Sequence, residues 1–148
     1  GKVSNLPWAF QDFMPTAAEL AGLKAPPGID GISVLPELIG EIAAGRRQAR
    51  HEFLYWELPR TEPGNRWAYR KEIPRQAVRM GPWKAVRSKP DGPLELYNLE
   101  DDITETRDVA AKQPRVMARI ADYLKTARTE PRPPVPYKDR WRGRTGPV

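Results

Sequence analysis

The sequence contains no cysteine and a single histidine, His51, among its 148 residues. Without cysteine the chain has no disulfide, no thiolate metal site and no cysteine nucleophile. A single histidine excludes paired-histidine metal sites, including the His-x-x-x-His zinc helix. Glycine-rich phosphate loops are missing too, and no serine stands in a nucleophile-elbow motif. The residues of most catalytic constellations are therefore missing from this chain.

Long apolar runs are also missing. No stretch approaches the roughly eighteen consecutive apolar residues that a membrane-spanning helix needs. Residues 1–5 lack the apolar core of a signal peptide. A mature chain or a fragment would have lost such a signal, so the sequence does not determine the cellular compartment.

Proline and charge are abundant instead. The 17 prolines exclude an all-helical bundle, because each removes a backbone donor and fixes φ, so it belongs at an element end, an edge or a loop. The net charge of +6 comes mostly from residues 125–148, where seven basic residues face two acidic ones. The rest of the chain is nearly neutral, so we expect no nucleic-acid binding. Residues 129–148 are predicted to form an extended, basic, proline-rich tail.

The first fifty residues predict short helices joined by loops. Residues 10–22 are expected to form a helix of about two turns that Asp12 or Thr16 caps and Gly22 ends, and Thr16 and Glu19 have the spacing of a capping box. The apolar stripe of this helix, which includes Phe13 and Leu20, needs a partner outside the segment. A loop follows at 24–33, a single helical turn at 35–39 and a charged stretch at 41–50. The main organisational break is placed near residue 50.

After residue 50 the pattern changes to strands. Residues 51–57, 75–80, 83–87 and 94–98 are rich in strand formers, and Gly81-Pro82 joins the middle two into a hairpin. Residues 58–73 form either a loop or a short edge hairpin. Residues 114–128 predict a helix with Pro114 in its first turn and one apolar face. The expected fold is α+β, a four-stranded antiparallel sheet packed by a long C-terminal helix.

Three groups of side chains have functional and structural interpretations. One group is an acidic cluster of Glu100, Asp101, Asp102 and Glu105, whose oxygens could bind a hard cation. We favour the interpretation that the cluster is a solvated turn leading into a helix N-terminus, and we predict no metal site. His51 precedes a strand, where a structural role is commoner than a functional one. The aromatic residues are assigned mainly to the sheet core rather than to stacking on bases or sugars; they are Phe53, Tyr55, Trp56, Trp67, Tyr69 and Trp83.

Several segments, in this order and spacing, resemble the C-terminal region of an arylsulfatase-type enzyme of the alkaline-phosphatase superfamily. They are residues 12–22, 28–33 with Leu35-Pro36, 54–57, 76–79, 81–84, and 95–102 leading to Glu105. The resemblance covers roughly residues 1–128 and leaves the tail outside. Ile103 departs from it, because the family commonly has proline there; this alters a turn and leaves the assignment standing.

The resemblance implies three parts. Residues 1–49 would be the terminal helix and connection of a large α/β sulfatase domain, residues 50–128 the C-terminal subdomain and residues 129–148 the tail. The family hydrolyses sulfate esters with a formylglycine, made within Cys/Ser-x-Pro-x-Arg, and a divalent cation, usually Ca²⁺. Those residues lie upstream in such proteins, so no catalytic or metal-binding residue is assigned here. The substrate-cleft candidates implied by the resemblance are His51, Glu57, Arg79 and Lys84.

These observations give one leading hypothesis and two alternatives. The chain would be part of a sulfatase, supporting its fold and one wall of its cleft, and would need the upstream catalytic domain as its partner. The first alternative is a free-standing protein-interaction module, and the second is a nucleic-acid binder that acts through the tail. An isolated chain is expected to self-associate through Phe13, Leu20 and Leu23, since apolar patches are rarely left in water.

Overall fold

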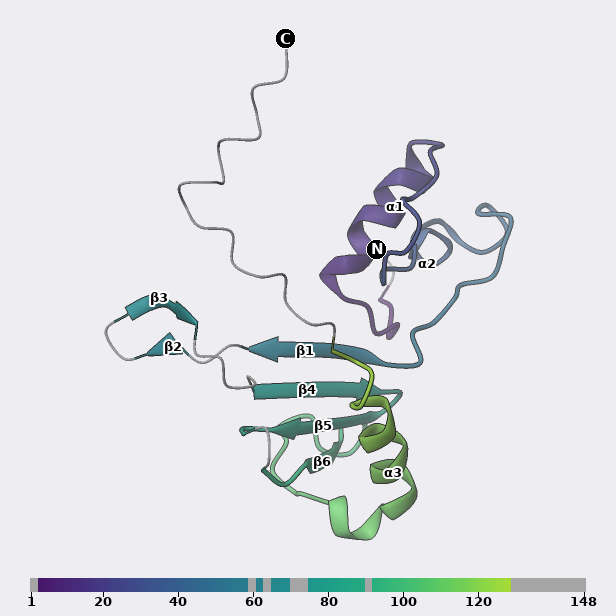
Figure 1. Cartoon of the computed structure of the whole chain (residues 1–148). Helices are drawn as coiled ribbons and strands as arrows, with labels where there is room; N and C mark the ends of the chain where they lie inside the picture. The colour runs from purple at the N-terminus through teal and green to yellow at the C-terminus, as the bar shows by residue number, and fades with distance from the viewer. Residues whose placement is uncertain (1–2, 59–60, 63–64, 70–74, 90–91, 129–148) are drawn as a thin grey trace.

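The computed structural model describes residues 3–58, 61–62, 65–69, 75–89 and 92–128, with 61–62 and 65–69 described by backbone alone. An N-terminal segment of short helices and loops lies beyond the β1 edge of a four-stranded sheet, and a C-terminal helix covers one face of that sheet (Figure 1). The elements are a 3-10 turn at Phe10–Asp12, α1 (Phe13–Leu20), α2 (Leu35–Ile39), β1 (Leu54–Leu58), β2 (Thr61–Glu62), β3 (Asn65–Tyr69), β4 (Arg75–Met80), β5 (Trp83–Arg87), β6 (Glu95–Asn98), a 3-10 turn at Ala110–Lys112 and α3 (Pro114–Tyr123).

The sheet is antiparallel with the order β1-β4-β5-β6, which confirms the four predicted strands. Gly81 and Pro82 form the two-residue turn between β4 and β5, and Gly81 adopts the positive φ of 56° that such turns require. β1 begins at Leu54, three residues later than predicted. β2 and β3 form a separate two-stranded sheet, so a short hairpin does form between β1 and β4.

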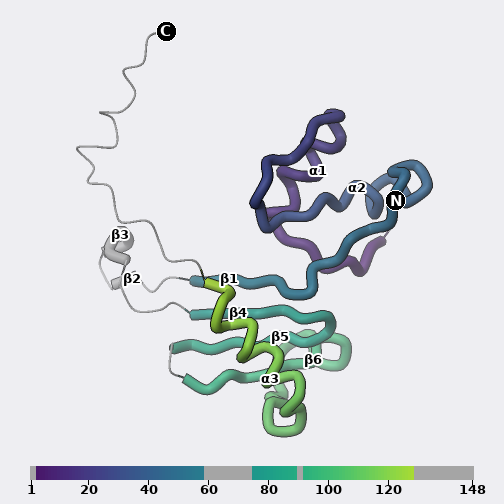
Figure 2. Tube along the Cα trace, turned by 45° about the vertical axis from the view of Figure 1, so that its right-hand side comes forward, coloured from purple at the N-terminus to yellow at the C-terminus, as the bar shows by residue number. Residues whose placement is uncertain are grey.

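The core lies between α3 and one face of the sheet (Figure 2). Ile120 of α3 is fully buried against Val78, Ala85 and Leu96, which are cross-strand neighbours in β4, β5 and β6. The ring of Tyr123 stacks on Phe53 with 4.2 Å between the ring centroids. The predicted α+β fold is therefore confirmed.

The C-terminal helix is shorter than predicted. α3 ends at Tyr123, and the turn that follows mixes i to i+3 bonds, from Lys125 N to Asp122 O and from Thr126 N to Tyr123 O, with one i to i+4 bond from Ala127 N to Tyr123 O. Among the described residues no helix is both long and apolar enough to span a membrane. The predicted tail, residues 129–148, and the side chains of Trp67 and Tyr69 lie outside what the structure describes.

The start of the first helix also differs from the prediction. α1 begins at Phe13, so Thr16 lies inside it and the predicted Thr16–Glu19 capping box does not form. The buried Thr16 hydroxyl instead donates to the carbonyl of Asp12 (2.6 Å) and accepts from the amide of Val34 (2.9 Å). Gly22, at φ 69°, follows the end of the helix as expected. Thr16 therefore ties the helix to the loop before α2.

The acidic cluster is not simply a solvated turn, and no helix begins at it. Asp102 is buried, and its carboxylate accepts hydrogen bonds from the amides of Thr106 and Arg107 and from the hydroxyls of Thr104 and Thr106. The bond from the Arg107 amide, followed by those from Thr106 and Thr104, lowers the pKa of Asp102. Asp102 thus supplies acceptors for an irregular loop, in which Glu105 adopts a left-handed φ of 57°.

Candidate functional site

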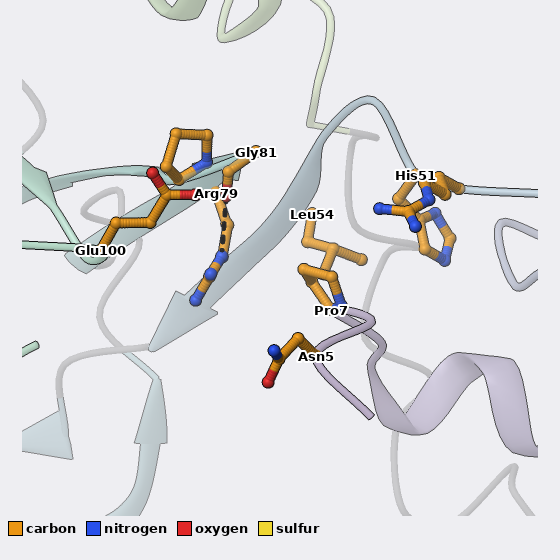
Figure 3. A pocket seen from close by; sticks show the side chains of 9 residues that line it. Asn5, Pro7, His51, Leu54, Arg79, Gly81 and Glu100 are labelled. Carbon is orange, nitrogen blue, oxygen red and sulfur yellow. Dashed lines mark hydrogen bonds between the residues drawn. The ribbon is translucent and has the colours of Figure 1, made fainter. Parts of the chain in front are cut away.

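Two of the four predicted cleft residues, His51 and Arg79, line one cavity of about 260 Å³ (Figure 3). This junction cavity lies between the N-terminal segment and the end of the sheet where β4 turns into β5. Figure 3 shows Arg79 on one side and His51 on the other, with Leu54 and Pro7 between them. The lining residues are Asn5, Pro7, Arg50, His51, Leu54, Arg79, Gly81, Pro82 and Glu100.

A buried carboxylate holds His51 in place. The Nε2 atom of His51 lies 2.7 Å from Oδ1 of Asp12, and the Asp12 side chain is fully buried. The same carboxylate accepts hydrogen bonds from the amide of Ala9 at Oδ2 and from the amide of Ile32 at Oδ1, each at 2.8 Å. A carboxylate only accepts hydrogen bonds, so His51 donates from Nε2, and in the neutral ring Nδ1 is the acceptor. Asp12 therefore fixes both the orientation and the tautomer of this histidine.

Glycine permits the close packing that brings the amide of Ile32 to Asp12. A Cβ atom built on Gly31 would lie 2.1 Å from the carbonyl oxygen of Gln11, well inside contact distance. The loop at 28–33 can therefore press against the residue before Asp12 only because position 31 has no side chain.

Arg79 lines the junction cavity and has no ion-pair partner among the residues that the structure describes. Its Nε donates to the carbonyl of Gly81 (3.1 Å), which holds the side chain along the β4–β5 turn. Within the described part of the chain neither Arg79 nor Arg50 forms an ion pair. Glu100 is the one carboxylate among the lining residues, so the two arginines leave an excess of positive charge there.

Lys84 lies next to Arg79 across the strands but does not line the junction cavity. The two are register partners in β5 and β4, on the face of the sheet opposite α3. The ammonium of Lys84 lies 2.5 Å from the carboxylate of Glu105, so Glu105 neutralises the charge of Lys84. On this face Lys84 is therefore paired with a carboxylate, whereas its neighbour Arg79 has no such partner in the described part of the chain.

Glu57 lies on the other face, beside the end of α3. It accepts the hydroxyl of Tyr55 and lies 3.2 Å from Nε of Arg128, while the amide nitrogen of Gln76 is 2.5 Å from the Tyr55 hydroxyl. Burial, followed by the bond to Glu57, raises the pKa of Tyr55. These contacts attach the end of the described chain to the sheet, far along β1 from the junction cavity.

Sequence reasoning missed three residues of the site. Arg50 and Asn5 come from segments read as charged surface and as chain terminus, and Asp12 was identified only as a helix cap. The Asp12–His51 contact joins positions 39 residues apart, which local pattern does not reveal.

The described residues do not fit the cation or the formylglycine that the resemblance implies. Among them no group of three or more His, Cys, Asp or Glu side chains is placed to hold a metal ion, and the sequence contains no Cys/Ser-x-Pro-x-Arg motif in which a formylglycine could form. No step of sulfate-ester hydrolysis is therefore assigned to these side chains.

Known proteins resemble the chain over most of its length. No family model matches it. It is 26% identical over 131 residues to arylsulfatase K of Danio rerio, a match that covers 82% of this chain and 22% of that protein. A putative sulfatase from Bacteroides thetaiotaomicron is 25% identical, with a TM-score of 0.58 over 77% of this chain and 24% of that one. A 2-O GAG sulfatase is 26% identical, with a TM-score of 0.60 over 78% and 23%.

The chain spans less than a quarter of the length of these relatives. The relatives that match this chain in sequence and in fold are described as sulfatases. The predicted resemblance is confirmed: this chain is similar in sequence and fold to the C-terminal region of sulfatases.

Proposed function

We propose that the chain is the C-terminal part of a sulfatase and acts only with an upstream catalytic domain of the same protein. It would complete the fold and form one wall of the substrate cleft, while the upstream domain supplies the formylglycine and the cation. Two facts support this: the relatives are about four times longer, and the sequence has no Cys/Ser-x-Pro-x-Arg motif. In addition, the described residues include no cluster of three or more metal-ligating side chains.

The observation that carries the proposal is the apolar surface of the N-terminal segment. Phe13 and Leu20 of α1 are each 60% exposed, and Leu23 is 68% exposed. An apolar cavity of about 220 Å³ opens beside them, lined by Leu6, Trp8, Phe13, Ala17, Leu20, Val34 and Leu38 among others. Apolar surface gathered in this way is normally buried by a partner. We assign it to the upstream domain, since the matches leave more than three quarters of the relatives unaccounted for.

The cleft-wall role is assigned to the junction cavity. His51 and Arg79 line it together, whereas Lys84 is paired with Glu105 and Glu57 is bound on the opposite face. The proposal therefore retains His51 and Arg79 as substrate-facing residues and gives Glu57 and Lys84 structural roles.

The alternative is a free-standing interaction module in which the same apolar surface binds a separate protein. Both functions use Phe13 and Leu20, so the exposed surface alone does not separate them. They differ in whether the covering surface belongs to the same polypeptide.

The test compares one substitution in two contexts. In the parent protein, Leu20→Glu should destabilise by about 2–4 kcal/mol and abolish sulfate-ester hydrolysis, because it buries a charge at the interface. In the isolated 148-residue chain it should leave stability nearly unchanged and convert self-associated species to monomer in sedimentation velocity. Ile103→Glu is the matched control, since Ile103 is 74% exposed but lies away from this surface. An isolated chain that is strictly monomeric, or a parent that tolerates Leu20→Glu, would contradict the proposal.

A further inference from the structure

We infer that the cavity between α1 and α2, the α1–α2 socket, receives one large apolar side chain of the proposed upstream domain. The inference rests on the proposed function and deepens it, because it replaces a general apolar contact by the insertion of a single side chain. The socket has a volume of about 220 Å³, and its lining comes from three separate stretches of the chain: residues 4–8, α1 and residues 34–38. α1 and α2 lie next to one another in the N-terminal segment (Figures 1 and 2).

The lining of the α1–α2 socket selects an apolar occupant. Seven of its ten lining residues are apolar, and the other three are Ser4, Thr16 and Glu37. The Ser4 hydroxyl already accepts the amide of Leu6 at 3.1 Å, and the Thr16 hydroxyl both donates and accepts a hydrogen bond. Apart from Glu37, the lining therefore leaves no hydroxyl or charged group to bond a polar ligand, whose transfer from water would be costly.

Hydrogen bonds hold the α1–α2 socket open before any partner arrives. The Thr16 hydroxyl donates to the carbonyl of Asp12 (2.6 Å) and accepts from the amide of Val34 (2.9 Å), which fixes α1 against the residue that precedes α2. Thr16 and Val34 are also the two buried residues of the lining, each 6% exposed. A preformed cavity binds its occupant without the cost of ordering its own walls.

Large apolar side chains form the exposed part of the lining. Trp8, Phe13, Leu20 and Leu38 are between 54% and 63% exposed. A side chain that enters between them would exclude water from this surface together with the buried residues of the lining. Anchors at the centre of protein interfaces, surrounded by contacts that keep water out, provide most of the binding energy in the same way.

The volume of the α1–α2 socket suits one ring-sized or branched group. An engineered apolar cavity of about 150 Å³ in another protein stays dry and binds benzene. At about 220 Å³ the socket admits a side chain of the size of phenylalanine or leucine, and it has this room because the lining residue Ala17 ends at a methyl group. We assign the occupant to the upstream domain, because the matches leave more than three quarters of the relatives outside this chain.

The first experiment is a titration of the ¹³C-labelled isolated chain with benzene, followed through the methyl signals of Ala17, Leu20 and Val34. It uses the Leu23→Glu variant, because Leu23 is 68% exposed and lies outside the socket, so self-association is reduced while the lining stays intact. We expect saturable shifts of these methyl signals and an unchanged signal of Ala85 in the sheet core. Linear shifts, or equal shifts in the core, would overturn the inference.

Substitutions on α1 and at its end test whether this cavity is responsible. Ala17→Leu places a branched side chain in the socket and should weaken benzene binding at least about ten-fold. Ala21→Leu makes the same change four residues later, at an exposed position outside the socket, and should leave binding unchanged. Benzene should also raise the melting temperature of the Leu23→Glu chain, which keeps the test decisive if Ala17→Leu does not fold.

The parent protein shows which partner fills the socket. If the upstream domain fills it, the parent should show no saturable benzene binding, and Ala17→Leu should lower the melting temperature of the parent because two side chains compete for one space. Benzene binding to the parent as tight as to the isolated chain would overturn the assignment. It would also be overturned if Ala17→Leu converts self-associated isolated chains to monomer and leaves the parent unchanged, since the occupant would then be a second copy. If benzene fails to bind the isolated chain while Leu20→Glu still inactivates the parent, the socket is wrong and the proposed function stands.

Discussion

The two parts of the molecule are held together by different forces. Residues 51–128 enclose an apolar core in which Val78, Ala85, Leu96 and Ile120 are at most 1% exposed. Residues 3–50 are positioned mainly by hydrogen bonds from side chains to backbone, while most of their large apolar side chains face outward. Burial of apolar side chains is the dominant favourable term in folding. The sheet with α3 has an apolar core of its own, as a domain that folds independently does, and the N-terminal segment has none of comparable size.

Gln48 illustrates how polar contacts replace a core in the N-terminal segment. Its side chain accepts the amide of Glu37 at 3.1 Å and donates to the carbonyl of Ser33 at 3.1 Å. Such bonds define a conformation but add only about 1 kcal/mol each. The proposed upstream domain would supply the apolar contact that these polar bonds do not provide.

The largest effect should come from opening the core of the sheet unit. Ile120→Ala removes a fully buried side chain between α3 and the sheet, and should lower the free energy of unfolding by about 2–5 kcal/mol. Urea denaturation monitored by tryptophan fluorescence measures the change. Ile103→Ala is the control, because Ile103 is exposed and its truncation should cost less than about 0.5 kcal/mol. A small effect at Ile120 would mean that the core of residues 51–128 is not what stabilises it.

A smaller and regional effect is expected at Asp12. Asp12→Ala leaves the half-buried amide of Ile32 and the ring of His51 without their acceptor, at a cost of about 2–4 kcal/mol. Hydrogen exchange followed by mass spectrometry should show loss of protection in residues 3–50 and unchanged protection in β4 and β5. Asp30→Ala serves as control, since Asp30 is exposed and donates or accepts no hydrogen bond among the described residues. Equal loss throughout the sheet would refute the division into two differently held parts.

The smallest effect concerns acid pH. Hydrogen bonds from Arg46 lower the pKa of Glu19 to about 2 from an ordinary value of 4.5. A lowered folded-state pKa means that the stabilisation is complete above pH 4.5 and is lost as the pH falls from 4.5 toward 2. Both side chains are about one-third exposed, so solvent limits the gain to under about 1 kcal/mol.

Comparison with a variant isolates this contribution. The difference in unfolding free energy between the native chain and Glu19→Gln should shrink steadily between pH 5 and pH 2.5. A difference that stays constant over that range would show that the Arg46–Glu19 pair adds no pH-dependent stability.

The sequence predicted the sheet well because each strand carries its own signal. Residues 75–80 and 83–87 alternate in period two around Gly81-Pro82, so their pairing needs no distant information. The end of α3 was placed too late, because residues 124–128 remain compatible with a helix and only the change in hydrogen bonding ends it.

The site could be predicted only in part. The resemblance implied His51, Glu57, Arg79 and Lys84 as one group of cleft candidates, and of these four the structure brings only His51 and Arg79 to the junction cavity. Glu57 pairs with Gln76 in the row facing α3, whereas Arg79 pairs with Lys84 in the row on the other face. That assignment depends on the register between β1 and β4, which the long connection between them leaves undetermined in the sequence.

The most direct test of the account is the intact mass of the protein in its source, combined with a peptide map. The account predicts a chain roughly four times the 16.8 kDa of this sequence, carrying a formylglycine within a Cys/Ser-x-Pro-x-Arg motif upstream of residue 1. A mature protein of 16.8 kDa with no such residue would contradict it and would favour the interaction module.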